Sequence, residues 1–318
     1  KVLDAPFEMY QGPGLPMWRP ENYEKEFIGL ATLRRGLELS RNLMTIRLAQ
    51  AVGMNKIAIN AEKFGVYDHL PRNLANSIGA YETTLLRMTT GYSEFDNGGK
   101  KIMPTLVDRI QDRNGKTIYR HDTRVCSDCN ASWHNQQDPL IPDNRVQIMD
   151  PRTAYQTVSL MEGVVLRGTG HSVSVIGKPL AGKTGTSNDS KDVWFIGFSP
   201  DLVCGVFVGY DDPKTLGKHE QGATVAAPIF RDFMKEALAG VPPIPFRVPP
   251  GIVFVPVDRF SGAEVPAGTP GSIEEAFRAG TEPGVAGIDD ASTATMNTQG
   301  QTTFGPATNV GEGTGGLY

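Results

Sequence analysis

The 318-residue sequence has few cysteines, no long apolar run and no excess of positive charge. Three cysteines are too few for a disulfide-dense scaffold. A formal net charge of −4 without a basic stripe lacks the electrostatic footprint of nucleic-acid binding, so we expect no nucleic-acid partner. No apolar run approaches the length that crosses a bilayer. Because the chain begins at Lys1 and not at Met, we expect a longer protein whose signal or anchor lies outside these residues.

Hydrophobic periodicity divides the chain into helices and one run of strands. Turn-rich residues 1–28 are expected to form an ordered connector around a core. Apolar spacing predicts helices at 30–39, 43–52, 55–64, 83–95, 152–166 and 225–238, the fifth started by Asp150 and Pro151. Apolar runs with short connections predict antiparallel strands at 178–186, 193–199 and 202–210. The expected fold class is α/β of the α+β type, with an antiparallel sheet flanked by helices.

Turn signals and composition assign the remaining segments. Asn114-Gly115 predicts a two-residue turn in a hairpin of residues 105–112 and 116–120. We interpret 121–149 as an inserted loop, 241–250 as a proline-rich linker, 252–257 with the Ser261-Gly262 turn as a small hairpin, and 272–278 as a short helix. The expected organisation is a main domain at 1–240, an extension at 241–283, and a disordered tail at 284–318.

The stretch Lys183-Thr-Gly-Thr186 carries the strongest chemical signal. In an extended strand, Lys183 and Gly185 face one way and Thr184 and Thr186 the other. At a sheet edge, Gly185 leaves room for a ligand to approach the backbone, the hydroxyls suit a carboxylate, and the ammonium adds positive charge. On these four residues alone, a solvated lysine on a strand that ends in a glycine turn is the favoured interpretation, and the rest of the sequence has to decide between the two.

Ser40 and Asn42 interrupt the helical pattern between the first two predicted helices. Serine and asparagine at such a break are typical of a helix N-cap, because their oxygens accept the free N–H groups of the next turn. We therefore predict a cap at this point, and the same geometry would fix the loop if it belongs to a site.

Together, a Ser-x-Asn between two helices and a Lys-Thr-Gly opening an antiparallel sheet are signature elements of penicillin-binding proteins and class A β-lactamases. The flanking stretches Trp18–Tyr23, Arg34–Asn42, Gly182–Phe198 and Ala226–Phe233 sharpen the likeness. Over about residues 1–240, the sequence resembles the transpeptidase domain of bifunctional class A penicillin-binding proteins.

That resemblance implies a serine D,D-transpeptidase that cross-links peptidoglycan stem peptides in the bacterial cell wall, on the periplasmic side of the inner membrane. It implies inhibition by β-lactam antibiotics, no cofactor, and cell-wall synthesis proteins as partners. By motif position, Ser40 and Lys183 would relay the proton to the leaving nitrogen, and Asn42 would hold the substrate amide. Thr184, Gly185 and Thr186 would bind the substrate, with hydroxyls on its carboxylate and the Thr186 N–H in the oxyanion hole.

The family's Ser-x-x-Lys, which supplies the nucleophile and its base, occurs nowhere in these residues. We expect a truncated chain that lacks this segment, the glycosyltransferase half and the membrane anchor, and that is inactive alone. Two other functions stay open: a hydrolase of the D,D-carboxypeptidase or β-lactamase type, and a non-catalytic domain that binds stem peptides or β-lactams.

His121, Cys126, Cys129 and His134 form the only weak candidate for a metal site. Two cysteines and two histidines can ligate zinc, but the spacing is unlike that of a zinc finger. A local disulfide between Cys126 and Cys129 is an equal alternative in an oxidising compartment. We predict no metal. A zinc- or disulfide-stabilised interaction module, with Lys183–Thr186 incidental, is a third functional alternative.

Overall fold

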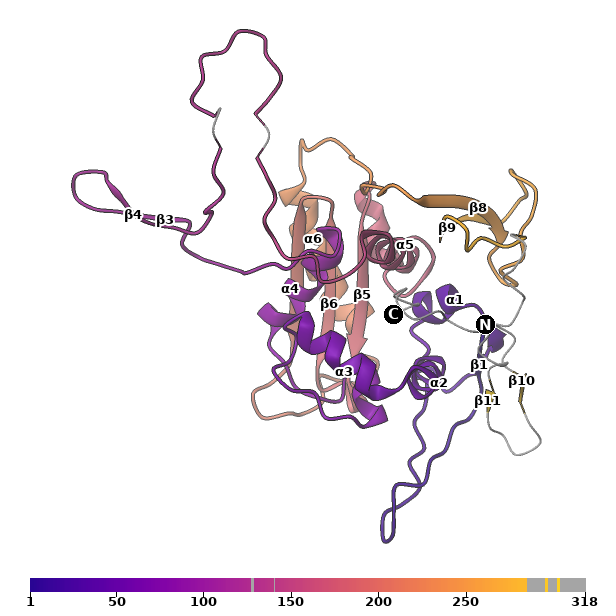
Figure 1. Ribbon diagram of the computed structural model, residues 1–318. Helices are drawn as coiled ribbons and strands as arrows, with labels where there is room; N and C mark the ends of the chain where they lie inside the picture. Colours follow the sequence, from indigo (N-terminus) through magenta and orange to yellow (C-terminus); the bar gives the residue numbers. More distant parts are fainter. Residues whose placement is uncertain (127–128, 140, 285–294, 297–301, 304–318) are drawn as a thin grey trace.

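The computed structural model describes residues 1–126, 129–139, 141–284, 295–296 and 302–303 (Figure 1). Its centre is an antiparallel sheet in the order β5-β6-β7, formed by β5 (Ala181–Thr186), β6 (Val193–Ser199) and β7 (Leu202–Val208). The predicted α+β class and all three strands are confirmed, although β5 begins three residues later than expected. β5 forms one edge of this sheet, so only one side of its backbone pairs with a strand.

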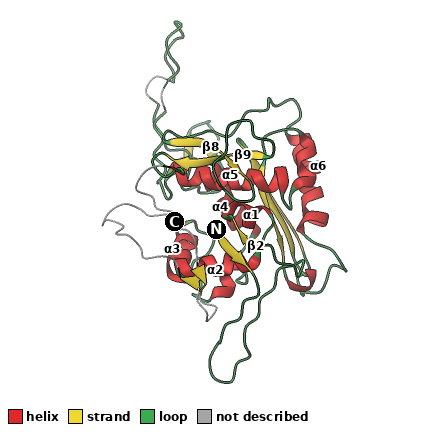
Figure 2. Cartoon of the chain, turned by 90° about the vertical axis from the view of Figure 1, so that its right-hand side faces the viewer, coloured by secondary structure: helices red, strands yellow, loops and turns green. Residues whose placement is uncertain are grey.

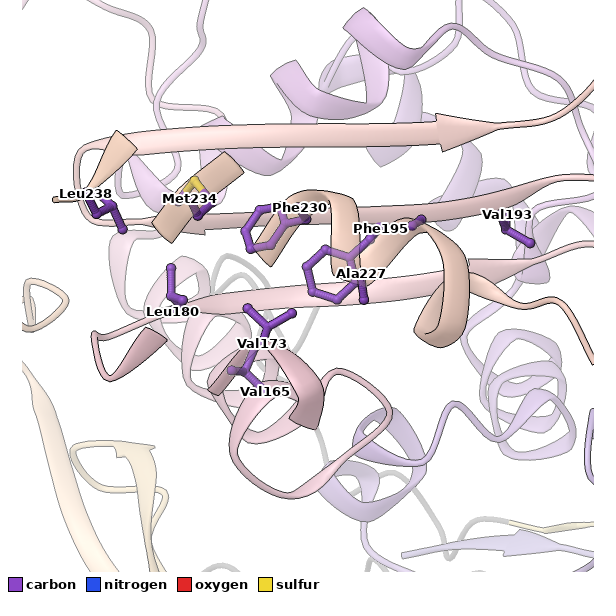
Figure 3. Packing of buried hydrophobic residues seen from close by; sticks show 10 residues of the cluster. Val165, Val173, Leu180, Val193, Phe195, Ala227, Phe230, Met234 and Leu238 are labelled. Carbon is purple, nitrogen blue, oxygen red and sulfur yellow. The ribbon is translucent and has the colours of Figure 1, made fainter. Parts of the chain in front are cut away.

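Helices cover both faces of the sheet. Successive side chains of β6 point to opposite faces, so this strand contributes apolar side chains to the packing on each face. Phe195 packs against Phe230 of α6 (Ala227–Ala237), with ring centroids 4.7 Å apart (Figure 3). Phe198 faces the other layer, where it contacts Phe246 and packs beside α5 (Pro151–Arg167). Burial on both faces accounts for the nearly continuous apolar sequence of this strand.

The N-terminal part comprises β1 (Val2–Asp4), β2 (Gly29–Ala31), α1 (Leu33–Glu38), α2 (Asn42–Val52), α3 (Met54–Lys63), the 3₁₀-helix η1 (Leu74–Ile78) and α4 (Leu85–Asp96). Figure 1 shows α1 and α2 on the side of the β5 edge, whereas α4 packs against β6 and β7. The predicted helix start at Leu30 is wrong, since Leu30 pairs with Leu3 in a strand. The leucine spacing misled because Leu30 and Leu33 are both exposed and define no buried face.

The predicted hairpin exists as β3 (Arg109–Gln111) and β4 (Thr117–Arg120), but its turn differs. The Asp112 N–H donates to the Lys116 carbonyl, which closes a three-residue loop in place of a two-residue one. The Asp112 carboxylate also accepts the Asn114 and Lys116 N–H groups, so this side chain stabilises the longer loop. Only Gly115 takes the left-handed conformation, as expected for a bulged three-residue connection.

The predicted cap at the start of α5 is confirmed, with the Asp150 carboxylate accepting the Arg152 N–H at 2.8 Å. Short helical segments follow at η2 (His171–Ile176), η3 (Asn188–Ser190) and the π-helix η4 (Gly222–Ala226). The described part of 121–149 forms no helix or strand beyond an isolated bridge from Gln147 to Lys100.

The predicted helix at 272–278 is wrong. These residues form β9 (Ser272–Arg278), which pairs along its whole length with β8 (Ile252–Asp258). The Ser261-Gly262 turn returns the chain only to a bridge between Val257 and Glu264. The helix-forming Glu-Glu-Ala of this segment is overridden by pairing to β8 and by burial of Ala276.

The hairpin β8–β9 packs beside α5 and α1 (Figure 2). In the segment predicted to be disordered, β10 (Thr295–Met296) pairs with β11 (Thr302–Thr303), and the rest beyond Gly284 lies outside the described residues. The domain boundaries at 240 and 283 stay predictions.

Candidate active site

Lys183 lies in the middle of β5 and reaches across to the turn between α1 and α2. Its ammonium donates to Ser40 Oγ at 2.6 Å and to the Thr184 carbonyl at 2.9 Å. Burial disfavours the charged form and lowers the pKa of Lys183 to about 8. At neutral pH Lys183 is therefore protonated, yet its pKa is close to the range in which it can release a proton.

Ser40 has a left-handed backbone, with a φ of 54°. Its N–H donates to the Leu37 carbonyl at 3.1 Å, so the turn that carries it is tied to the last turn of α1. The predicted Ser40 cap is wrong: the N-cap of α2 is Arg41, which makes no side-chain cap bond. An N-cap residue has an extended backbone, whereas the backbone of Ser40 is left-handed. The Ser40 hydroxyl, moreover, is bonded to Lys183 and not to a backbone N–H group of α2.

Asn42 is the first residue of α2 and turns its carboxamide toward the N-terminal connector, where it donates to the Glu21 carbonyl at 3.0 Å. Nearby, the Asn22 side chain accepts the Leu43 N–H at 3.3 Å and donates to Asp4. The structure thus brings Ser40 and Lys183 together, while Asn42 contacts the connector.

Thr184 and Thr186 lie on the other face of β5, in the alternation that the sequence predicts. The Thr184 and Thr169 hydroxyl oxygens are 2.7 Å apart, and Thr186 Oγ1 accepts the Gly222 N–H at 3.0 Å. Because the Thr186 oxygen already accepts a bond, its own proton is left to donate to a ligand.

Two glycines allow the backbone at the start of η4 to lie against β5. A Cβ on Gly222 would be 2.6 Å from the Gly185 carbonyl oxygen and 2.5 Å from the Trp194 carbonyl oxygen. A Cβ on Gly185 would be 3.1 Å from Trp194 Cβ. Gly222 of this same chain therefore lies close to the Gly185 backbone. This close packing holds the Gly222 N–H at the Thr186 hydroxyl oxygen.

Sequence analysis missed Thr169 and Gly222 and gave Asn22 no role. Thr169 had a detectable signal, since it stands between Gly168 and Gly170 directly after a helix. Gly222 had none, because its contact depends on how η4 packs against the sheet.

Of the metal candidates, Cys126 and Cys129 form a disulfide. The disulfide alternative therefore holds, and neither sulfur is a thiolate available to zinc beside His121 or His134. Within residues 1–126, 129–139 and 141–284, no group of three or more His, Cys, Asp or Glu side chains is placed to hold a metal ion.

The "Penicillin binding protein transpeptidase domain" family matches residues 2–235, most of the chain. The chain belongs to this family. The resemblance inferred from Ser40, Asn42 and Lys183–Thr186 is thereby confirmed, although membership does not by itself assign their roles.

Curated relatives and solved structures agree with this membership. Penicillin-binding protein 1A of Rickettsia bellii is 48% identical over 278 residues, which cover 86% of this chain and 35% of the relative. The crystal structure of penicillin-binding protein 1A from Haemophilus influenzae has a TM-score of 0.76 and 32% identity, covering 89% of this chain and 45% of that one. PonA1 from Mycobacterium tuberculosis, solved in complex with penicillin V, has a TM-score of 0.61 at 22% identity, covers 77% and 65%, and shows likeness of fold alone.

The chain spans about a third of the length of the curated relatives that it matches. Within the part of the chain that the structure describes, no helix combines the length and apolar character needed to cross a bilayer.

Proposed function

We propose that this penicillin-binding transpeptidase chain supplies the proton-relay and carboxylate-binding side of a serine D,D-transpeptidase centre that cross-links peptidoglycan stem peptides. The observation that carries the proposal is the 2.6 Å contact between Lys183 Nζ and Ser40 Oγ beside an edge strand. A buried cation on a hydroxyl is a proton-relay arrangement, and family membership supports acyl transfer as the reaction class.

In the proposed reaction, a serine hydroxyl gives its proton to the base that Ser-x-x-Lys supplies with it and attacks the carbonyl of the penultimate D-Ala, and the bond to the terminal D-Ala nitrogen breaks. That proton is relayed through Ser40 to the leaving nitrogen, while the Lys183 ammonium holds and polarises the Ser40 hydroxyl. An amine of a second stem peptide then takes the acyl group from the serine, and the proton that the amine loses returns to the serine oxygen. Asn42 is half-buried and would have to break its solvent-exposed hydrogen bond to Glu21 to hold the substrate amide.

The terminal carboxylate is assigned to the Thr184 and Thr186 hydroxyls, with the nearby Lys183 charge in support. The Thr186 hydroxyl has its proton free to donate, because its oxygen accepts the Gly222 N–H. The Thr186 N–H is assigned to the oxyanion hole, where the loss of one donor typically costs about a hundredfold in rate. β-Lactams would occupy the same places, as a protein of the same fold does bind penicillin V.

No serine in the sequence is followed by a lysine three positions on. We therefore propose that these 318 residues bind the substrate terminus but are not acylated by themselves. Incubation with fluorescent penicillin followed by a denaturing gel should give no labelled band. A stable covalent adduct would overturn this part of the proposal.

Binding is tested by NMR titration of the isotope-labelled chain with acetyl-D-Ala-D-Ala. We expect shifts of the β5 amides, loss of those shifts with Lys183→Met, and their retention with the exposed-lysine control Lys235→Met. The C-terminal amide of the same peptide lacks the carboxylate and should bind more weakly. Equal binding of peptide and amide, or no binding at all, would contradict the assignment.

A hydrolase would need a general base that activates water at the site. Burial raises the pKa of Glu162 to about 7, but its charged neighbours are Arg34 and Arg167, not Lys183. Asp96 also has a pKa raised to about 7, but it lies by Asp201, in the β6–β7 turn at the opposite end of the sheet from Thr186. Neither favours hydrolysis over transfer. Cross-linked product from the chain joined to a family segment carrying Ser-x-x-Lys would separate a transpeptidase from a mere binding domain.

The proposed setting is the periplasmic face of the bacterial inner membrane, where stem peptides and other cell-wall synthesis proteins are found.

A further inference from the structure

We propose that Glu275 of the β8–β9 hairpin is a positioning residue for the candidate active site, acting through Arg34 to hold the end of α1 that carries Ser40. The inference rests on the proposed function, because it concerns the same site. Glu275 lies outside residues 2–235, the part of the chain that the family matches.

Arg34 joins three elements at a buried point. Its side chain is 5% exposed, and Nε and Nη2 donate to the two carboxylate oxygens of Glu275 at 2.5 and 2.6 Å. The same guanidinium donates to the carbonyl and hydroxyl of Ser159 on α5, at 2.9 and 3.0 Å. A forked pair of this kind fixes orientation as well as distance. Arg34 therefore ties α1 to α5 and to β9 at once.

α1 needs such external support because it has only six residues. A helix this short is not stable alone, so its direction is set by what it packs against. The turn that follows is bonded to the helix, through Ser40 N–H to the Leu37 carbonyl and Arg41 N–H to the Gly36 carbonyl at 2.8 Å. A tilt of α1 therefore moves the Ser40 hydroxyl relative to Lys183.

The last residue of α1 also supports the carboxylate-binding side. The Glu38 carbonyl accepts the Thr169 N–H at 3.0 Å, and the Thr169 hydroxyl lies 2.7 Å from that of Thr184. The Glu38 carboxylate accepts from Arg167 at 2.6 Å and lies 3.6 Å from Arg34. The C-terminal end of α1 therefore positions the Ser40 hydroxyl beside Lys183 on one face of β5. Through Thr169 it also positions the Thr184 hydroxyl on the other face.

The β8–β9 hairpin is itself held in place by its packing against α5, so it can fix the position of Arg34. Ala276, next to Glu275, is 2% exposed and belongs to the core cluster that includes Tyr155. The Gln156 side chain on α5 donates to the Ala276 carbonyl at 2.9 Å. Glu274 points the other way and is exposed, which makes it a matched control on the same strand.

The test measures the pKa of Lys183 by NMR of lysine side-chain nitrogens in the 318-residue chain without substrate, with the signal assigned by Lys183→Arg. Burial lowers this pKa, so loosening the contact with Ser40 and admitting water should raise it. We expect Glu275→Gln and Arg34→Lys each to raise the pKa of Lys183 by about one unit, and the double variant to do no more than the larger single effect. Glu274→Gln should leave it unchanged.

Loss of the Glu275 charge alone, without movement, would shift the pKa of Lys183 the other way, because a distant negative charge favours the ammonium. A downward or absent shift in folded variants would therefore overturn the proposal. If Glu275→Gln fails to fold, Glu275→Asp keeps the charge but shortens its reach, and it should still raise the pKa. No shift in Glu275→Asp would likewise overturn the inference. Failure of acetyl-D-Ala-D-Ala to bind the unmodified chain would count against the proposed function and leave the coupling measured here intact.

Discussion

Lys183 Nζ lies 2.6 Å from Ser40 Oγ, although 143 positions separate the two residues in the sequence. The contact joins the edge strand of the central sheet to a left-handed turn at the end of α1. It exists only in the folded chain, so properties of either group report directly on how the N-terminal layer packs against the sheet.

The first prediction concerns the pH dependence of stability at Lys183. Its pKa is lowered from 10.5 to about 8 by burial, so between those values the unfolded chain binds more protons than the folded one. This group therefore makes stability rise with pH across that window, and its cost is greatest below pH 8. We expect Lys183→Met to raise the free energy of unfolding at pH 7 by about 1–3 kcal/mol, and by less at pH 10. Urea denaturation at both pH values measures this, and Lys235→Met should change neither; a Lys183→Met gain that is the same at both would be inconsistent with burial as the cause.

Thr169 is predicted to orient the Thr184 hydroxyl. Thr169→Val keeps the shape but removes the partner 2.7 Å from Thr184 Oγ1. Since one hydrogen bond contributes about 1 kcal/mol, binding of acetyl-D-Ala-D-Ala should weaken about fivefold. Thr169→Ser restores the hydroxyl and should restore affinity. Calorimetry or NMR titration measures both, and unaltered binding by the valine variant would rule out this role.

Gly168 and Gly36 provide a matched pair for stability. A Cβ on Gly168 would lie 2.2 Å from the Glu38 carbonyl oxygen, a backbone atom that cannot move without shifting α1. A Cβ on Gly36 would meet only the flexible end of Met44, at 2.8 Å. We expect Gly168→Ala to lower the free energy of unfolding by about 2–4 kcal/mol, and Gly36→Ala by less than about 1. Equal losses in urea denaturation would contradict the close approach at Gly168.

Asp96 is predicted to destabilise the fold at neutral pH. Burial, with the nearby Asp201 charge as the smaller cause, raises the pKa of Asp96 from 3.8 to about 7. The folded chain therefore binds the extra proton, and stability from this group is lost as the pH rises from about 4 through 7. Asp96→Asn should raise the free energy of unfolding at pH 8 by about 1–3 kcal/mol and change it little at pH 4. The exposed control Asp138→Asn should have no effect at either pH.

The cysteines give a chemical prediction. Cys126 and Cys129 are joined and Cys204 is free, so the unfolded chain should react with one thiol reagent equivalent without reductant and with three after reduction. Metal analysis of the folded chain should find no stoichiometric zinc. Three reactive thiols before reduction, or bound zinc, would refute the disulfide.

Features with a local physical cause were predictable from the sequence. The strand run 181–208 follows from apolar residues between short connections, and α5 follows from its apolar stripe with Asp150 as a cap. The chemistry of Lys183–Thr186 was also visible, because strand alternation alone separates the lysine from the threonines.

The errors occurred where distant partners decide the local structure. Residues 272–278 favour a helix by composition but form β9 because β8 pairs with them. Ser40 resembles a helix cap in sequence but has a left-handed backbone, with its hydroxyl bonded to Lys183. The two-residue turn predicted at Asn114-Gly115 does not form. A three-residue loop, which the Asp112 side chain stabilises, takes its place.

The sequence by itself determined the family, the order of the sheet strands and the residue types available for acyl transfer, because motifs and periodicity are properties of neighbours along the chain. Only the tertiary structure decided that Asn42 bonds to Glu21, that Thr169 and Gly222 bond to the threonines of β5, and that Glu275 pairs with Arg34 of α1. These contacts join residues from 15 to 241 positions apart, and no local preference specifies which groups will meet once the layers pack.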